Sequence, residues 1–210
     1  MKASRPGSRS SSTAASSPAA GARCTDRIPA WSWSRIEPTK LESEALVAEI
    51  PELCALSATE QRSLIESRSI SSRELTQAHL DWIDRVNPQV NALCTLVPEL
   101  ALSQADAVDA VLAAGEPPGA LAGLPAAIKD LVNTRGIRTT HGSPLLAANV
   151  PGHDALHVAR MKAAGAVILG KTNTPEWGAG SQTFNPLFGA TATPYDLSRT
   201  SGGSSGGAAA

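Results

Sequence analysis

The clearest periodicity of apolar residues lies between Ser71 and Pro88. Apolar side chains recur there at spacings of three and four residues, which predicts one stripe of an amphipathic helix: Leu75, Ala78, His79, Trp82, Ile83 and Val86. Ser71 and Glu74 form a capping box that would start this helix. Asn87 is expected to end it, because a residue before proline avoids helical dihedrals. A second capping box, Ser57 with Glu60, places the start of folded chain near Ala55.

The rest of the pattern alternates helices with strands. An alanine-rich helix is expected from Pro98, which suits a first turn, to Ala114, with Gly115 after it. LPAAIKDLV then predicts a strand that carries Lys129. Asp154 is expected to cap a helix over 155–164, and Gly165 to stop it before a short strand, AVIL. Strand, helix and strand in this order predict a β-α-β unit of an α/β fold.

The amino-terminal fifty residues differ in composition from the rest. MKASRPGSRSSSTAASSPAAGARC is rich in Ser, Ala and Arg and contains no acidic residue. We expect residues 1–50 to be a disordered extension before a folded domain at 51–210, because little apolar surface offsets the ordering entropy. An organelle transit peptide and a start codon assigned too far upstream would look the same. A cytoplasmic protein is the favoured interpretation, with organelle import left open.

Charge, hydropathy and cysteine content argue against several classes of protein. Eighteen basic and 19 acidic residues nearly cancel, which leaves no electrostatic footprint for nucleic acid or for an anionic membrane. The sequence contains no run of 18 apolar residues that would predict a membrane-spanning helix. Cys24, Cys54 and Cys94 are too few and too far apart for a disulfide framework or a zinc site. His153 and His157 have the spacing of a metal pair, but no third ligand stands out, so no metal site is predicted.

GAVILGKT, at 165–172, matches the phosphate-binding pattern G-x-x-x-x-G-K-T. A P-loop needs a strand before its first glycine and a helix after its lysine. Here a helix is predicted before Gly165, and the four middle residues are themselves a strand. Asn173-Thr174-Pro175 is also a poor start for a long helix. The context therefore disfavours a nucleotide-binding function, although the motif keeps it as an alternative.

TSGGSSGGAAA, from Thr200 to Ala210, is typical of a flexible linker when it stands alone. Together with Lys129 it also suits catalysis. A buried lysine loses its proton more easily, since desolvation disfavours the charged form, and a neutral lysine beside a serine is a general base. Serine with lysine, without histidine, is a known nucleophile and base arrangement. Glycines around the serines allow backbone geometry that other residues cannot adopt.

Five segments together resemble the amidase signature family: GLPAAIKDL, TTHGS, AGAVILGKTNTPEWG, NPLFG and SGGSSGGAAA. The resemblance spans about Leu56 to Ala210 and implies the amino-terminal part of an α/β fold, a mixed β-sheet covered by α-helices. It implies hydrolysis of a carboxylic amide to an acid and ammonia or an amine through a Ser-cisSer-Lys triad. By position, Lys129 matches the base and Ser204 the serine after a cis peptide bond. The resemblance gives a supporting or substrate-binding role to Gly202, Gly203 and Ser205.

The same resemblance places the attacking serine and the oxyanion-hole amides in a second glycine-rich stretch, which the sequence does not reach before Ala210. We therefore expect a truncated amidase domain that is inactive alone, with a trans Gly203–Ser204 peptide. Lys171 is implied to be structural. No metal or organic cofactor is implied. The expected partner is a small-molecule amide, with no nucleic acid and no membrane, and a homodimer of the intact protein stays open.

Two alternatives to an amidase remain at this point. A non-catalytic fragment that only binds a partner is one, and the P-loop NTPase is the other. An amidotransferase subunit that releases ammonia from glutamine falls within the amidase hypothesis.

Overall fold

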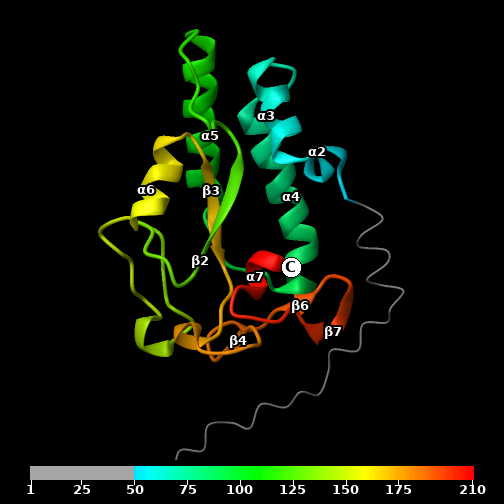
Figure 1. Cartoon of the computed structure of the whole chain (residues 1–210), viewed down its shortest axis with the longest axis vertical. Coiled ribbons are helices and arrows are strands. Elements are labelled where there is room, and N and C mark those ends of the chain that lie inside the picture. Colours follow the sequence, from blue (N-terminus) through cyan, green and yellow to red (C-terminus); the bar gives the residue numbers. More distant parts are fainter. Residues whose placement is uncertain (1–49) are drawn as a thin grey trace, which may run out of the picture. The chain divides into compact units, whose positions relative to one another are not determined.

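The computed structural model describes residues 50–210 (Figure 1). Nearly all of the predicted disordered extension, and Cys24 with it, lies outside the described residues. The longer helices and strands are α2 (Glu52–Ala55), α3 (Ala58–Glu66), α4 (Ser72–Val90), β1 (Leu93–Leu96), α5 (Pro98–Ala113), β2 (Pro125–Lys129), α6 (Leu156–Ala163) and β3 (Val167–Thr172). Short elements follow: β4 (Phe184–Asn185), β5 (Gly189–Ala190), β6 (Ala192–Thr193), β7 (Asp196–Thr200) and α7 (Gly206–Ala209).

A three-stranded sheet in the order β1-β3-β2 forms the centre of the described part of the chain. β2 and β3 run parallel, and β1 pairs antiparallel with β3, so the sheet is mixed, as predicted. Helices α4 and α5 pack against one face, where Val167 and Leu169 meet Leu80, Ala101 and Ala105 (Figure 1). On the other face Ile168 packs with Val158 of α6. Thus β2, α6 and β3 form the expected β-α-β unit.

Both predicted capping boxes are present. The Ser71 hydroxyl accepts a hydrogen bond from the Glu74 amide at 3.0 Å, and the Glu74 carboxylate accepts one from the Ser71 amide at 2.7 Å. Ser57 and Glu60 make the same reciprocal pair at the start of α3. Each box satisfies amides that a helix start leaves without partners. Pro98 occupies the first turn of α5, also as expected.

Helix α4 is longer than predicted. It continues through Pro88 to Val90 and is capped by Asn91 in the left-handed conformation. Val90 is buried in a cluster with Ala92, Ala192 and Leu197, and this burial favours the additional turn. A proline in the last turn removes only one backbone hydrogen bond.

The predicted cap of α6 is also corrected. The N-cap residue is Ala155, with no side-chain cap, and the helix spans Leu156–Ala163. The Asp154 carboxylate instead accepts hydrogen bonds from the Arg135 amide at 2.7 Å and from Lys162 Nζ at 2.8 Å. An ion pair to the last turn of its own helix and a bond to a neighbouring loop therefore take the place of capping.

Candidate active site

Lys129 is the last residue of β2, and its partner in β3 is Thr172. The backbone amide of the next residue, Asp130, donates to the Thr172 carbonyl at 3.0 Å, so the strand pairing extends past the lysine. The Lys129 side chain is half-buried. Burial lowers the pKa of its amine below the ordinary lysine value. A lower pKa makes the neutral, proton-accepting form more accessible.

The serine pair of the GGSSGG segment lies against this amine. Lys129 Nζ is 2.9 Å from Ser204 Oγ and 3.0 Å from Ser205 Oγ, although about 75 residues separate the two segments in sequence. The Gly203–Ser204 peptide is cis, which corrects the expectation of a trans bond. The structure therefore brings together the three polar side chains that the sequence singled out.

The glycines of the same segment allow this approach. Gly202 has φ of 75°, a left-handed conformation that favours glycine. A Cβ atom on Gly203 would lie 2.9 Å from the backbone nitrogen of Gln182, closer than real contacts allow. The left-handed conformation of Gly202 and the close backbone packing at Gly203 therefore determine the positions of Ser204 and Ser205.

Two threonines that sequence reasoning did not select hold the serine segment in place. The Thr174 hydroxyl donates to the Ser204 carbonyl at 3.3 Å. The Thr183 hydroxyl accepts from the Gly206 amide at 3.0 Å. Both threonines are fully buried. The GKTNT and NPLFG neighbourhoods of the sequence contained these residues, but nothing in the sequence indicated their distance from Ser204.

A buried amide network supports the same region from behind. Asn173 Oδ1 accepts from the Thr174 amide at 3.0 Å and from Asn185 Nδ2 at 2.7 Å. Asn173 Nδ2 donates to Thr191 Oγ1 at 3.0 Å and to the Gly189 carbonyl at 3.2 Å. All polar groups of this side chain are thereby satisfied, as buried amides require.

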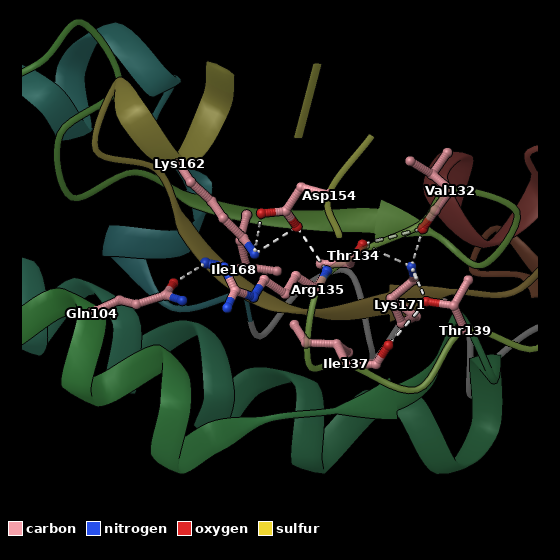
Figure 2. Close-up of polar contacts among 10 residues, drawn as sticks. All are labelled: Gln104, Val132, Thr134, Arg135, Ile137, Thr139, Asp154, Lys162, Ile168 and Lys171. Atoms are coloured by element: carbon pink, nitrogen blue, oxygen red, sulfur yellow. Dashed lines mark hydrogen bonds and ion pairs between the residues drawn. The ribbon is translucent and has the colours of Figure 1, made fainter. Parts of the chain in front are cut away.

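The P-loop-like segment is strand, and its lysine faces the interior. Lys171 is fully buried, and its ammonium donates to the Val132 carbonyl, to Thr134 and to Thr139 (Figure 2). No phosphate cradle follows it, because the chain continues as strand to Thr172. The structure therefore contradicts the nucleotide-binding alternative and agrees with a structural role for Lys171.

The histidines and cysteines considered in the sequence lie as follows in the described residues. His153 and His157 are exposed, and within residues 50–210 no group of His, Cys, Asp and Glu could hold a metal ion. Cys54 and Cys94 are free thiols, and burial raises the pKa of Cys94 to about 12. Across the described part of the chain, no helix is long and apolar enough to cross a membrane.

Curated proteins that resemble this chain include amidotransferase subunits. It is 50% identical over 159 residues to a glutamyl-tRNA(Gln) amidotransferase subunit from Acidothermus cellulolyticus and, likewise, to one from Salinispora arenicola. Each match covers 76% of this chain and 32% of the relative. The chain thus spans about a third of the length of these curated relatives.

Solved structures of amidases are also similar to this chain. A bacterial aryl acylamidase of the amidase signature family superposes with a TM-score of 0.70 at 34% identity, covering 73% of this chain and 32% of the other. The peptide amidase of Stenotrophomonas maltophilia gives 0.69 at 34% identity, covering 74% and 33%. The family described as Amidase matches residues 74–210. This chain therefore belongs to the amidase signature family.

Proposed function

We propose that this chain supplies the general base and the proton-relay serine of an enzyme that hydrolyses a carboxylic amide to an acid and ammonia or an amine. The observation that carries the proposal is the contact of Lys129 Nζ with Ser204 Oγ at 2.9 Å and Ser205 Oγ at 3.0 Å. The other lysines within residues 50–210 have different partners: Lys162 donates to Asp154, and Lys171 donates to a carbonyl and two threonines. Membership of the amidase signature family supports the same chemistry.

Lys129 is the base in this proposal. A neutral amine has one lone pair and two N–H donors. It can accept the proton of one serine hydroxyl and donate to the other, which suits two hydroxyls at nearly equal distances. Burial lowers the pKa of Lys129, so the amide-cleaving form should increase as pH rises through a value below the ordinary pKa of lysine.

The reaction proceeds by proton transfer through Ser204. Neutral Lys129 accepts the Ser204 proton while Ser204 accepts the proton of an attacking serine, which the family resemblance places beyond Ala210. The attacking oxygen bonds to the amide carbonyl carbon, the C–N bond breaks, and the leaving nitrogen takes up the proton that was transferred to Lys129. Water then hydrolyses the acyl-enzyme, which regenerates the serine.

A second candidate within this chemistry is release of ammonia from glutamine. It is favoured by the names of the curated relatives, which are amidotransferase subunits. In that case the intact protein works with partner subunits, and the released ammonia is used by the assembly instead of being lost to solvent. The solved relatives are named for other amides, so both candidates belong in the same assay.

A chimera tests the proposal. The 159-residue matched segment of the Acidothermus cellulolyticus protein is replaced by the corresponding segment of this chain, and ammonia release is measured with glutamine, acetamide and benzamide. We expect turnover that falls by about 100-fold or more in Lys129→Met and Ser204→Ala, because a positioned acid–base group contributes about 10²–10⁴. Lys162→Met, which removes a lysine on α6, is the control and should keep the rate.

The substrate profile separates the two candidates. Turnover restricted to glutamine favours the amidotransferase role, and turnover of simple amides favours a free-standing amidase. Activity that survives Lys129→Met and Ser204→Ala would show that neither residue carries the chemistry.

A further inference from the structure

Lys171 is a buried lysine that has no part in the proposed reaction. Its side chain has no exposed surface. The ammonium contacts three oxygens of the loop between β2 and α6: the Val132 carbonyl at 2.5 Å, Thr134 Oγ1 at 2.9 Å and Thr139 Oγ1 at 2.9 Å (Figure 2). A buried ammonium is costly unless its donors are satisfied, and here all three donors have acceptors.

The two threonines can serve only as acceptors toward Lys171. The Thr134 hydroxyl hydrogen is donated to the Val132 carbonyl at 3.2 Å, and that of Thr139 to the Ile137 carbonyl at 3.0 Å. Each hydroxyl has a single hydrogen, so Lys171 must provide the hydrogen in every contact. A neutral amine has two N–H donors and would leave one acceptor bare. The hydrogen-bond pattern therefore favours the ammonium form, in which all three acceptors have a donor.

Charged neighbours are consistent with this form. Asp130, which is also fully buried, attracts the ammonium, as does Asp154 more weakly, whereas Lys162 repels it. The Asp130 carboxylate is held by the Thr140 amide at 3.1 Å and by the Thr140 hydroxyl. The Lys171 ammonium on β3 and the Asp130 carboxyl group in the loop after β2 are therefore both buried and interact electrostatically.

The loop that Lys171 holds begins with a tight turn at Lys129 itself. The Val132 amide donates to the Lys129 carbonyl at 2.9 Å, and the Val132 carbonyl accepts from Lys171. A single residue, Val132, therefore connects the buried ammonium of Lys171 to the backbone of Lys129 through its carbonyl and its amide. Ile128 pairs with Lys171 and Lys129 with Thr172, so the two lysines leave the sheet on opposite faces. Direct contact between the amines is excluded, and the connection runs through the turn.

We infer that Lys171 is a positioning residue: its ammonium fixes the turn that ends β2 and so holds the Lys129 amine against Ser204 and Ser205. The importance of this position for catalysis rests on the proposed function. The environment of the Lys129 amine can nevertheless be measured without an activity assay.

The experiment measures how readily the Lys129 amine reacts. The 210-residue chain is labelled with an amine-specific acylating reagent from pH 6 to 10, and the labelled fraction of Lys129 is read by mass spectrometry. The variants are Lys171→Met and Thr139→Val, which removes one acceptor without changing charge. Lys162→Met is the matched control, because it removes a positive charge that does not contact the turn, and its partner Asp154 still accepts from the Arg135 amide (Figure 2).

In the wild type, burial keeps the pKa of Lys129 low, so its amine reacts at lower pH than a free lysine. We expect both Lys171→Met and Thr139→Val to release Lys129 into water and move its labelling midpoint upward, with the labelled fraction at pH 8 falling about three- to tenfold. Lys162→Met should leave the midpoint unchanged. If Lys171→Met does not fold, Thr139→Val alone decides.

Two results would overturn the inference. An unchanged Lys129 midpoint in Lys171→Met or in Thr139→Val would mean that the turn does not set the position of the base. A midpoint that moves in Lys171→Met and Lys162→Met alike, but not in Thr139→Val, would mean that lost positive charge acts through space. Neither result depends on whether Lys129 is catalytic, so failure here is distinct from failure of the proposed reaction.

Discussion

Burial of Lys171 predicts that this protein becomes more stable as the pH rises above neutral. Desolvation lowers the pKa of Lys171 from 10.5 to about 8 in the folded chain, with the attraction of Asp130 opposing part of that effect. Between these two values the unfolded chain binds more protons than the folded one, so the free energy of unfolding increases with pH. Below pH 8 both states are protonated, and the full cost of the buried charge is present.

The size of the effect follows from the two pKa values. A difference of 2.5 corresponds to about 3 kcal/mol, of which about 2.5 kcal/mol should be recovered between pH 7 and pH 10. Urea unfolding of the wild type and of Lys171→Met at several pH values gives the difference in unfolding free energy, in which the other titrating groups cancel. Lys162→Met should retain the rise. A difference that is flat, or that falls with pH, would show that the three hydrogen bonds to the ammonium outweigh desolvation and would refute the reasoning.

Two further predictions concern function. We expect the 210-residue chain alone to hydrolyse neither acetamide nor benzamide above a catalyst-free control, because the family resemblance places the attacking serine beyond Ala210; turnover that Lys129→Ala abolishes would contradict this. We also expect calorimetry with Mg-ATP to detect no binding at residues 165–172, because Lys171 is buried within a strand. Micromolar binding that Lys171→Ala removes would restore the nucleotide-binding alternative.

Local signals in the sequence predicted the elements around the site with few errors. The capping boxes at Ser57 and Ser71 depend on residues three apart, and both are present as expected. The expected end of α4 at Asn87 was wrong, because burial of Val90 outweighs the cost of one proline in a last turn. Propensity rules describe the isolated helix, whereas that final turn is stabilised by contacts with β6 and β7.

Contacts between residues far apart in the sequence could be predicted only where the family resemblance implied them. Lys129 and Ser204 are paired in the sequence by motifs that occur together in the family. The acceptors of Lys171 could not be found in this way, because Thr134 and Thr139 lie more than 30 residues before it and belong to no catalytic pattern. Asp154 shows the same limit: it has the residue type and position of a helix cap, yet a lysine on the far turn and a loop amide take its oxygens.

The pairing of β2 with β3 shifts register between Ala126 and Ala127, which places a β-bulge at Gly170 in β3. Residues 169 and 170 together oppose Ala127, which shifts the alternation of β3 so that Lys171 falls on the same face as Ile168 and Thr172 on the face of Lys129. A side chain at Gly170 would meet the Thr95 carbonyl oxygen at 2.1 Å, so the glycine is needed there. Deleting one residue before Lys171 would turn its ammonium into the apolar cluster beneath α4 and α5. The face of the sheet on which Lys171 lies is therefore set by the number of residues in β3 together with the glycine that permits the bulge.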